Sequence, residues 1–423
     1  MWFKIRILFF YLLTRYGRKF RDRAALERFQ ERRIQWHLDW VRRHSKFYRD
    51  WTGGVIDKKV MMEHFNNLNT VGVDRDHAFE LAFRAETSRD FTATLNGVTV
   101  GLSSGTSGNR GLFLVSDSER ARHAGTILAK ILPGSIFGRY RVAFFMRANS
   151  NLYTASAGSR IRFEFYDLLA PLEDHLMRLE AQQPELLFAP PSMLIRLAEA
   201  RSNGRITVRP VRIFSIAETL DPLDERKISA AFGMKVHQIY QCTEGFLAAS
   251  CPEGTLHLNE DCVRIDPEWL DSSRTKFMPI ITDFTRTSQP VIRYRLNDIL
   301  TLRTSPCPCG SVMTAIESIE GRSDDVIQFR GPSGPVAVFP DFIRRAVITA
   351  DPSIEEYLVT QSCEGEVDIH IKSPDADFQR VLTRVKEEVR LLAIRVGALQ
   401  PTVRFHAGIP SFSGKKLRRV LRL

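Results

Sequence analysis

Residues 102–111, LSSGTSGNRG, concentrate glycine and hydroxyl side chains in one short stretch. Glycine lets backbone N–H groups converge because it has no Cβ, and Ser and Thr hydroxyls add further donors. Such a loop can cradle a phosphate. It is not a Walker A loop, because Asn109 and Arg110 follow Gly108 where that motif requires Lys and then Ser or Thr. A flexible hairpin between strands is the alternative interpretation.

Two further stretches carry groups suited to a nucleotide. In IYQCTEG, Tyr240 offers an aromatic face for a purine, the Thr243 hydroxyl can reach a phosphate, and the Glu244 carboxylate can hold Mg²⁺. In PVIRYRLND, Asp298 follows a strand-like run, and a carboxylate there can accept hydrogen bonds from both ribose hydroxyls. Taken alone, IYQCTEG is equally typical of a strand end followed by a turn.

Sulfur and imidazole groups form a separate set outside nucleotide chemistry. CPEGTLH supplies Cys251 and His257, and SPCPCG supplies Cys307 and Cys309. Three thiolates and one imidazole are a standard ligand set for a closed tetrahedral zinc site. The alternative is that these are buried cysteines or cysteines in turns.

In their order along the chain, these stretches resemble the motifs of the adenylate-forming superfamily of acyl- and aryl-CoA ligases. The resemblance is closest to the branch of phenylacetate-CoA ligase and coenzyme F390 synthetase, and it runs from HSKFYRDW to SGKKLRRVLR. It implies that ATP phosphates are held by the loop residues Ser103, Ser104, Gly105, Thr106, Ser107 and Gly108. The chain departs from the family at GNRG, where a proline and often a lysine are usual, and at Gln241, where glycine is usual.

The resemblance also implies roles for single residues. Tyr240 would stack on adenine, Thr243 would bind phosphate, and Glu244 would hold Mg²⁺. Asp298 would bind the ribose, and Lys415 in the closing SGK segment would swing into the site during adenylation. The remaining implied positions are Ala217 and Glu218 beside adenine, Arg322 near the nucleotide, and Asp324 at a hinge between domains. The alternatives are a solvated turn or helix cap at Asp324 and a basic tail around Lys415.

These motifs predict an enzyme that uses ATP and Mg²⁺ to adenylate an aryl or fatty carboxylic acid. The acyl group would then pass to CoA or to the thiol of an acyl carrier protein. One alternative is adenylylation of a hydroxyl group, as in F390 synthetase. Another is a membrane-associated homologue that binds nucleotide without turnover.

The elements that must position these residues are predicted as an α/β fold. Strand-like runs at 141–146, 186–190, 212–217 and 235–240 alternate with helical stretches at 118–131, 173–182, 191–202 and 221–232. This alternation predicts a parallel or mixed sheet covered by helices on both faces. We expect a basic amphipathic helical segment at 1–50, a large ATP- and substrate-binding domain at 51–320, and a small mobile α+β domain at 321–423.

The charge of the chain is concentrated at its two ends. Of the net +11 over 423 residues, +9 lies in residues 1–50 and +5 in residues 413–423, which leaves −3 for the rest. A mildly acidic body argues against a nucleic-acid partner. The apolar run 7–13 is too short to span a bilayer, and basic residues rather than a cleavage site follow it. This segment predicts either a helix that packs on its own protein or peripheral contact with the inner face of the membrane. The small number of cysteines favours the cytoplasm.

Overall fold

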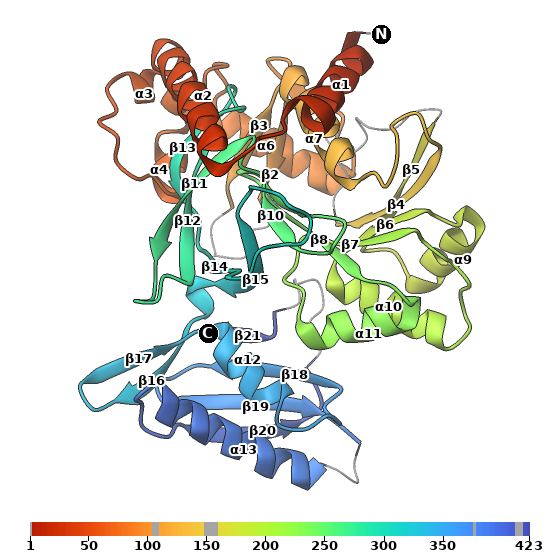
Figure 1. The fold of residues 1–423 in the computed structure, drawn as a ribbon, viewed down its shortest axis with the longest axis vertical. Helices are drawn as coiled ribbons and strands as arrows, with labels where there is room; N and C mark the ends of the chain where they lie inside the picture. Colours follow the sequence, from red (N-terminus) through yellow and green to blue (C-terminus); the bar gives the residue numbers. More distant parts are fainter. Residues whose placement is uncertain (1, 104–109, 148–159, 375–377, 411–417) are drawn as a thin grey trace. The chain divides into compact units, whose positions relative to one another are not determined.

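The computed structural model describes residues 2–103, 110–147, 160–374, 378–410 and 418–423 (Figure 1). The chain divides into two compact units. The first comprises Met1–Ala217, Ile228–Leu296 and Leu302–Glu317, and the second comprises Glu218–Lys227, Asn297–Thr301 and Ser318–Leu423. Among the described residues, no helix combines the length and the apolar character that a membrane crossing requires.

The first unit opens with helices. α1 (Trp2–Leu12) runs into a short π-helix, η1 (Leu13–Gly17), and α2 (Arg23–His44) follows. α2 begins where the Asp22 side chain accepts a hydrogen bond from the Ala25 N–H, and it ends at Ser45, whose side chain caps the next short helix, α3 (Lys46–Arg49). Three further helices complete this region: α4 (Lys58–Glu63), α5 (Phe65–Leu68) and α6 (Arg75–Ser88).

α1 packs closely against α7 (Asp117–Ile131), and Gly125 makes this possible. A Cβ at Gly125 would lie 2.5 Å from the Ile7 carbonyl oxygen and 2.9 Å from the Tyr11 backbone nitrogen. Ile7 and Tyr11 are buried in the core cluster that α7 shares with the main sheet. The expected packing of this helix on its own protein is therefore confirmed.

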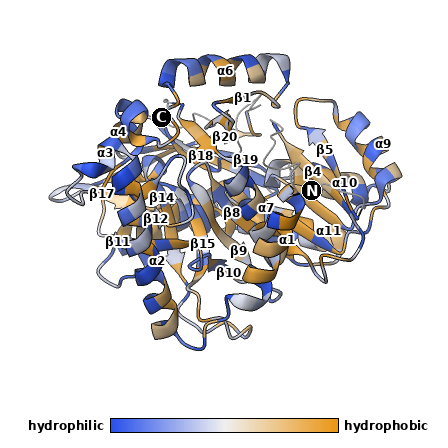
Figure 2. Cartoon of the chain, turned by 90° about the horizontal axis from the view of Figure 1, so that it is seen from above, coloured by the Kyte–Doolittle hydropathy of each residue, from blue (hydrophilic) through white to orange (hydrophobic). Residues whose placement is uncertain are grey.

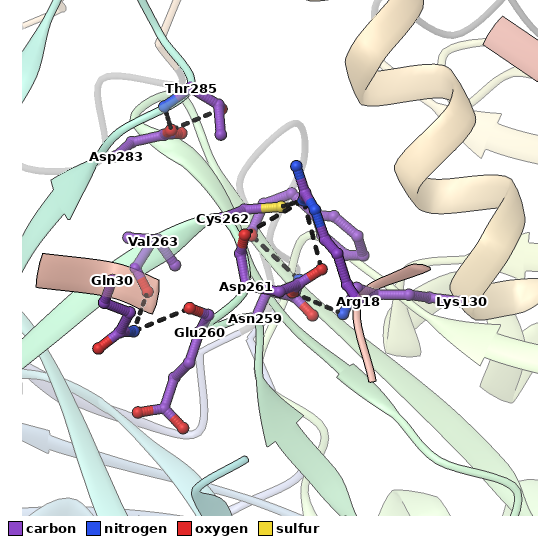
Figure 3. Close-up of polar contacts among 11 residues, drawn as sticks. Arg18, Gln30, Lys130, Asn259, Glu260, Asp261, Cys262, Val263, Asp283 and Thr285 are labelled. Atoms are coloured by element: carbon purple, nitrogen blue, oxygen red, sulfur yellow. Dashed lines mark hydrogen bonds and ion pairs between the residues drawn. The ribbon is translucent and has the colours of Figure 1, made fainter. Parts of the chain in front are cut away.

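A buried set of charged groups ties the segment after α1 to the rest of the first unit (Figure 3). The Arg18 guanidinium donates to the Asp261 backbone oxygen at 3.1 Å, and Lys130 Nζ lies 3.0 Å from Asp261 Oδ1. Although burial raises the pKa of Asp261, the charges of Lys130 and Arg18 outweigh burial and lower it. The amide of Gln30 on α2 donates to the Glu260 backbone oxygen at 2.8 Å.

Twelve strands form the main sheet, in the order β11-β12-β14-β15-β10-β9-β8-β7-β6-β4-β5 with β13 beside β12. Its parallel part comprises β4 (Tyr140–Met146), β5 (Ile161–Asp167), β6 (Leu186–Ala189), β7 (Arg212–Ser215) and β8 (Val236–Cys242). The connecting helices are α7, α9 (Leu172–Gln182), α10 (Pro191–Ser202) and α11 (Pro222–Phe232). The alternation predicted from the sequence is confirmed.

Antiparallel strands extend this sheet and form a second, smaller one. The additional strands of the main sheet are β9 (Gly245–Ser250), β10 (Leu256–Leu258), β11 (Val263–Trp269), β12 (Lys276–Asp283), β13 (Val291–Arg295), β14 (Asp298–Leu302) and β15 (Ala315–Arg322). The smaller sheet contains β1 (Thr94–Leu95), β2 (Val98–Leu102) and β3 (Leu112–Val115), all antiparallel. The main sheet is therefore mixed, as expected.

In the second unit, α12 (Pro340–Ile348) and α13 (Phe378–Arg395) share a core with a four-stranded sheet ordered β20-β19-β18-β21. The strands are β18 (Glu356–Gln361), β19 (Glu366–Lys372), β20 (Thr402–Ala407) and β21 (Val420–Arg422). Alternate residues of β19, including Val367, Ile369 and Ile371, are buried. A hairpin of β16 (Ile327–Gly331) and β17 (Gly334–Val338) precedes α12. The α+β character is as expected, and the antiparallel strands β18 and β19 lie between the two helices in the chain.

Candidate active site and metal-ligand cluster

The base of the glycine- and hydroxyl-rich loop is held together by Ser103. The Ser103 N–H donates to the Gly111 carbonyl oxygen at 2.7 Å, and its Oγ accepts from the Gly111 N–H at 2.7 Å and from Lys58 Nζ at 3.1 Å. A Cβ at Gly111 would lie 2.8 Å from Lys58 Cε, so only glycine fits without a shift. Ser104, Gly105, Thr106, Ser107 and Gly108 lie outside the described residues.

The side chain of Arg110, at the end of this loop, binds two other residues of the first unit. Its Nη1 donates to Glu86 Oε2 at 2.7 Å and its Nη2 contacts Glu86 Oε1, while its Nε donates to the Ser103 carbonyl oxygen at 3.2 Å. Its guanidinium also lies over the Phe83 ring, 5.6 Å from the centroid. Arg110 and Glu86 therefore anchor the loop to α6.

At the end of β8, two hydroxyl groups converge on one carboxylate. Thr243 Oγ1 donates to Glu244 Oε2 at 2.8 Å, and Tyr294 Oη, from β13, donates to Glu244 Oε1 at 3.0 Å. Burial raises the pKa of Tyr294, and the neighbouring negative charge of Glu244 raises it further. The phenol therefore keeps the proton that it donates. Tyr240, on the same strand, is buried. Carboxylate oxygens are ligands that Mg²⁺ accepts, so Glu244 fits the metal role predicted for it.

Two residues outside the predicted site support this turn: Arg286 contacts it directly, and Glu119 holds the two residues that follow Arg286. Arg286 Nη1 donates to the Thr243 carbonyl oxygen at 2.6 Å, and its Nη2 donates to the Leu114 carbonyl oxygen of β3 at 3.2 Å. The Glu119 carboxylate, at the start of α7, accepts from the backbone N–H groups of Thr287 and Ser288 at 2.5 and 2.9 Å. Burial raises the pKa of Glu119, but the Ser288 hydrogen bond and the Arg286 charge outweigh burial and lower it. Tyr294 lies within the PVIRYRLND motif and Arg286 lies four residues before it, so this motif was the available signal for both.

Ala217, the predicted adenine contact after β7, has a left-handed backbone with φ of 65°. Residues other than glycine adopt this conformation at a cost and do so mainly where a turn is functionally constrained. This conformation suits the contact with adenine that the resemblance implies for Ala217, and that contact stays a prediction. Its neighbour Glu218 is the first residue of the second unit.

Within the second unit, Asp298, Arg322 and Asp324 lie on neighbouring segments. Asp298 is the first residue of β14, and its Oδ1 lies 3.9 Å from Arg322 Nε. Asn297 Nδ2 donates to Asp324 Oδ2 at 3.0 Å, and the Ser323 N–H donates to the Asn297 carbonyl oxygen at 2.7 Å. Asp324 sits in a short 3₁₀-helix, η2 (Ser323–Asp325). The roles of Asp298 at the ribose and of Asp324 at a hinge stay predictions, and Lys415 lies outside the described residues.

The structure brings together the four predicted zinc ligands. The ligand atoms of Cys251, His257, Cys307 and Cys309 all lie within 4.8 Å of one another. Cys251 Sγ is 3.7 Å from Cys307 Sγ, and Cys309 Sγ is 3.4 Å from His257 Nε2. In a tetrahedral zinc site, metal–sulfur bonds are about 2.3 Å and metal–nitrogen bonds about 2.0 Å long. Such a site places two sulfur ligands roughly 3.8 Å apart and a sulfur and a nitrogen ligand roughly 3.5 Å apart, close to the separations found here.

Two further observations fit a metal at this cluster. His257 Nδ1 lies 3.0 Å from the Met313 carbonyl oxygen, which assigns the ring proton to Nδ1 and leaves Nε2 as the ligand atom. Burial raises the pKa of the Cys307 thiol, but hydrogen bonds from Thr255 and the Cys309 backbone outweigh burial and lower the pKa to about 6. Burial raises the pKa of the neighbouring Cys309 thiol to about 12, so Cys307 is the thiolate of this pair before a metal binds. The thiolate is the form that binds metal.

Comparison with solved structures identifies the class of fold. The structure of 2-hydroxyisobutyryl-CoA ligase matches with a TM-score of 0.67 and 18% identity, covering 95% of this chain and 89% of that one. The amide bond synthetase McbA from Marinactinospora thermotolerans matches with a TM-score of 0.53 and 17% identity, covering 75% and 67%. The chain therefore has the fold of adenylate-forming enzymes, with a large N-terminal part and a small C-terminal part, and the expected fold class is confirmed.

Sequence comparison identifies particular relatives. The chain is 23% identical over 292 residues to the phenylacetate-coenzyme A ligase of Thermus thermophilus, covering 59% of this chain and 63% of that protein. It is 26% identical over 224 residues to protein CapK of Staphylococcus aureus, covering 52% and 49%. The match thus spans less than two thirds of either relative. No family model matches. Together with the fold, these relatives confirm the resemblance to the adenylate-forming superfamily in its phenylacetate-CoA ligase-like branch.

Proposed function

We propose that this chain is an ATP- and Mg²⁺-dependent ligase that adenylates an aryl or fatty carboxylic acid and passes the acyl group to a thiol. The observation that carries the proposal is the carboxylate of Glu244, held between the hydroxyls of Thr243 and Tyr294 at the end of β8. The relatives support it: one is named a phenylacetate-coenzyme A ligase, and 2-hydroxyisobutyryl-CoA ligase was solved in complex with 2-HIB-AMP and CoA.

In the first half-reaction, an oxygen of the substrate carboxylate attacks the α-phosphorus of ATP. The bond from that phosphorus to the bridging oxygen breaks, and pyrophosphate leaves with the electron pair. Tyr240 stacks on the adenine, and Asp298 accepts the ribose hydroxyls. The Thr243 hydroxyl turns from Glu244 to donate its proton to a phosphate oxygen. Glu244 would hold Mg²⁺, and the bound ion would supply positive charge to offset the negative charge of the phosphate oxygens.

In the second half-reaction, a thiol of CoA or of a carrier protein attacks the acyl carbon. The carbon–sulfur bond forms, the bond to the phosphate oxygen of AMP breaks, and the thiol proton leaves to solvent. The protein contributes position and charge rather than covalent chemistry. The ammonium of Lys415 serves the first half-reaction, where it offsets the charge that develops on the transferring oxygens.

Substrate-dependent release of pyrophosphate from ATP and Mg²⁺ tests this proposal. The full chain is assayed against a panel of aryl and fatty acids, with and without CoA, beside Lys415→Ala, Glu244→Gln and the adjacent control Lys416→Ala. We expect one acid class to trigger release. We expect a loss of about hundredfold in the first two variants, because one removes the ammonium that offsets the developing negative charge and the other removes the carboxylate that would hold Mg²⁺. The control should keep near-parental rates.

The other outcomes separate the rival functions. Release triggered by a hydroxyl compound and by no acid would replace carboxylate adenylation with hydroxyl adenylylation. ATP binding without release under any condition would favour a homologue that does not turn over. An acyl-AMP product that CoA leaves unchanged but a phosphopantetheine-bearing protein consumes would assign the carrier protein as the acceptor.

We also propose that Cys251, His257, Cys307 and Cys309 hold a structural zinc ion. The spacing of the four ligand atoms and the orientation of His257 support this. Elemental analysis of the purified full chain should find about one zinc per chain, and Cys251→Ser should lose it, whereas Cys363→Ser, at an exposed cysteine elsewhere, should keep it. Failure of the parent chain to retain zinc after reconstitution would contradict the site.

A further inference from the structure

One face of α1 presents large apolar side chains to solvent. Trp2, Ile5, Phe9 and Leu12 are 76%, 48%, 56% and 43% exposed, and Tyr16 of η1 is 59% exposed. They follow one another at intervals of three or four residues, which places them along one side of a helix. We call these five residues the apolar stripe. An exposed apolar surface of this kind marks a site of contact with a protein or a membrane.

The stripe cannot turn inward, because the other side of α1 is fixed on the first unit. Ile7 and Tyr11 are buried, and Gly125 lets the backbones of α1 and α7 approach closely. The two helices lie side by side (Figures 1 and 2). Arg15 Nη1 donates to the Ala129 carbonyl oxygen at 2.9 Å, and Arg18 lies in the buried cluster around Asp261 (Figure 3). The remaining aromatic rings of the helix, Phe3 and Phe10, lie under Arg120 and Arg122 of α7. The stripe is thus presented on a rigid support.

Positive charge surrounds the stripe. Residues 2–21 carry six Lys and Arg and no Asp or Glu. Arg15 and Arg18 are used in the contacts above, while the side chains of Lys4, Arg6 and Lys19 are exposed. Apolar side chains that enter the headgroup boundary, with cations beside them that meet lipid phosphates, are the two features of a helix that lies in an anionic membrane surface.

From this arrangement we propose that the apolar stripe docks the protein on an anionic lipid bilayer, with α1 lying in the plane of the interface. A second copy of the chain is the less suitable occupant, because two such helices face to face would bring like charges together. The inference is independent of the proposed adenylation activity, since neither the stripe nor its flanking cations belong to the candidate active site.

Co-sedimentation of the purified full chain with vesicles tests the proposal. The vesicles contain phosphatidylcholine alone or a mixture of phosphatidylcholine and phosphatidylserine, at low and high salt. We expect binding to the mixed vesicles to be at least about tenfold tighter than to neutral ones and to weaken as salt rises. The double variant Trp2→Ser/Phe9→Ser should bind at least about tenfold more weakly, and Lys4→Gln/Arg6→Gln should lose the preference for anionic lipid.

The matched control is Leu169→Ser/Met177→Ser, which removes two side chains that are 67% and 68% exposed elsewhere in the first unit. It should bind vesicles like the parent, and thermal unfolding should show that every variant is folded. Equal binding by the stripe variant and the parent, or no binding by the parent to either vesicle, would overturn the proposal. So would a parent dimer that Trp2→Ser/Phe9→Ser converts to a monomer, because the stripe would then be an interface between copies.

Discussion

Glu244 accepts hydrogen bonds from two hydroxyl groups that reach it from different parts of the chain. Thr243 is its neighbour in sequence, whereas Tyr294 lies 50 residues further on. Each bond restricts the rotation of the carboxylate, so a metal ion held there would meet a ligand already oriented. Because the pKa of Tyr294 is raised, its phenol remains a hydrogen-bond donor at neutral pH.

Loss of the Tyr294 hydroxyl should therefore impair both catalysis and stability. Tyr294→Phe removes one hydrogen bond to a charged group, a contribution of about 1.5 to 3 kcal/mol, and we expect pyrophosphate release to slow by about tenfold or more. Tyr140→Phe is the matched control, since the Tyr140 hydroxyl donates to the Ser135 carbonyl oxygen in an exposed loop. A Tyr294→Phe rate equal to that of the parent would show that Thr243 alone suffices to orient Glu244.

The sequence motifs predicted Thr243 and Glu244 but did not reveal Tyr294 or Arg286. The first two are neighbours within a single motif, so a local pattern contains both. Arg286 reaches the Thr243 carbonyl from a loop 43 residues away, and no local pattern encodes that approach. Arg110 had no assigned role in the sequence, and its pairing with Glu86 likewise depends on where α6 packs.

Helices with strong local signals were predicted to within a residue or two. The helix expected at 118–131 is α7, and its start is fixed by a capping box between Ser116 and Glu119. The zinc ligands show the opposite case. Cys251 and Cys307 meet because β10 pairs with β15, with His257 opposite Ala315. The ligand types suggested the site, but only that long-range pairing brings the residues together.

The packing of α1 on α7 depends on a glycine, and a side chain there should loosen the N-terminal helix. Gly125→Val places carbon atoms within about 3 Å of the α1 backbone, where neither helix can yield easily. Overpacking of this kind typically costs about 1 to 3 kcal/mol, and we expect a lower unfolding temperature and faster proteolysis between α1 and α2. Ser118→Ala, in the exposed first turn of α7, is the control. Proteolysis unchanged from the parent would mean that α1 adjusts without separating.

Stability of the whole protein should depend on pH through histidines that are buried without charge. His37 on α2 is fully buried, and neither of its ring nitrogens has a hydrogen-bond partner among the described residues. Burial, with the charges of Arg33 on the same helix and Arg122 on α7, lowers its pKa from 6.5 to about 4, against a smaller opposing effect of Glu119. The pKa of His37 is lower in the folded state than in the unfolded state, so neutral His37 stabilises the fold. This stabilisation is complete above pH 6.5 and is lost as pH falls towards 4.

A shift of this size corresponds to a loss of up to about 3 kcal/mol of unfolding free energy between neutral pH and pH 4. Urea denaturation of the parent at pH 7, 5.5 and 4 should show the decline, to which His175 and His237 add because burial also lowers their pKa values. His37→Leu fills the same buried position without a titrating group, so its stability should fall less steeply. His77→Leu, at an exposed histidine, should follow the parent. If His37→Leu and the parent lost stability in parallel, acid sensitivity would have to arise from the other buried groups.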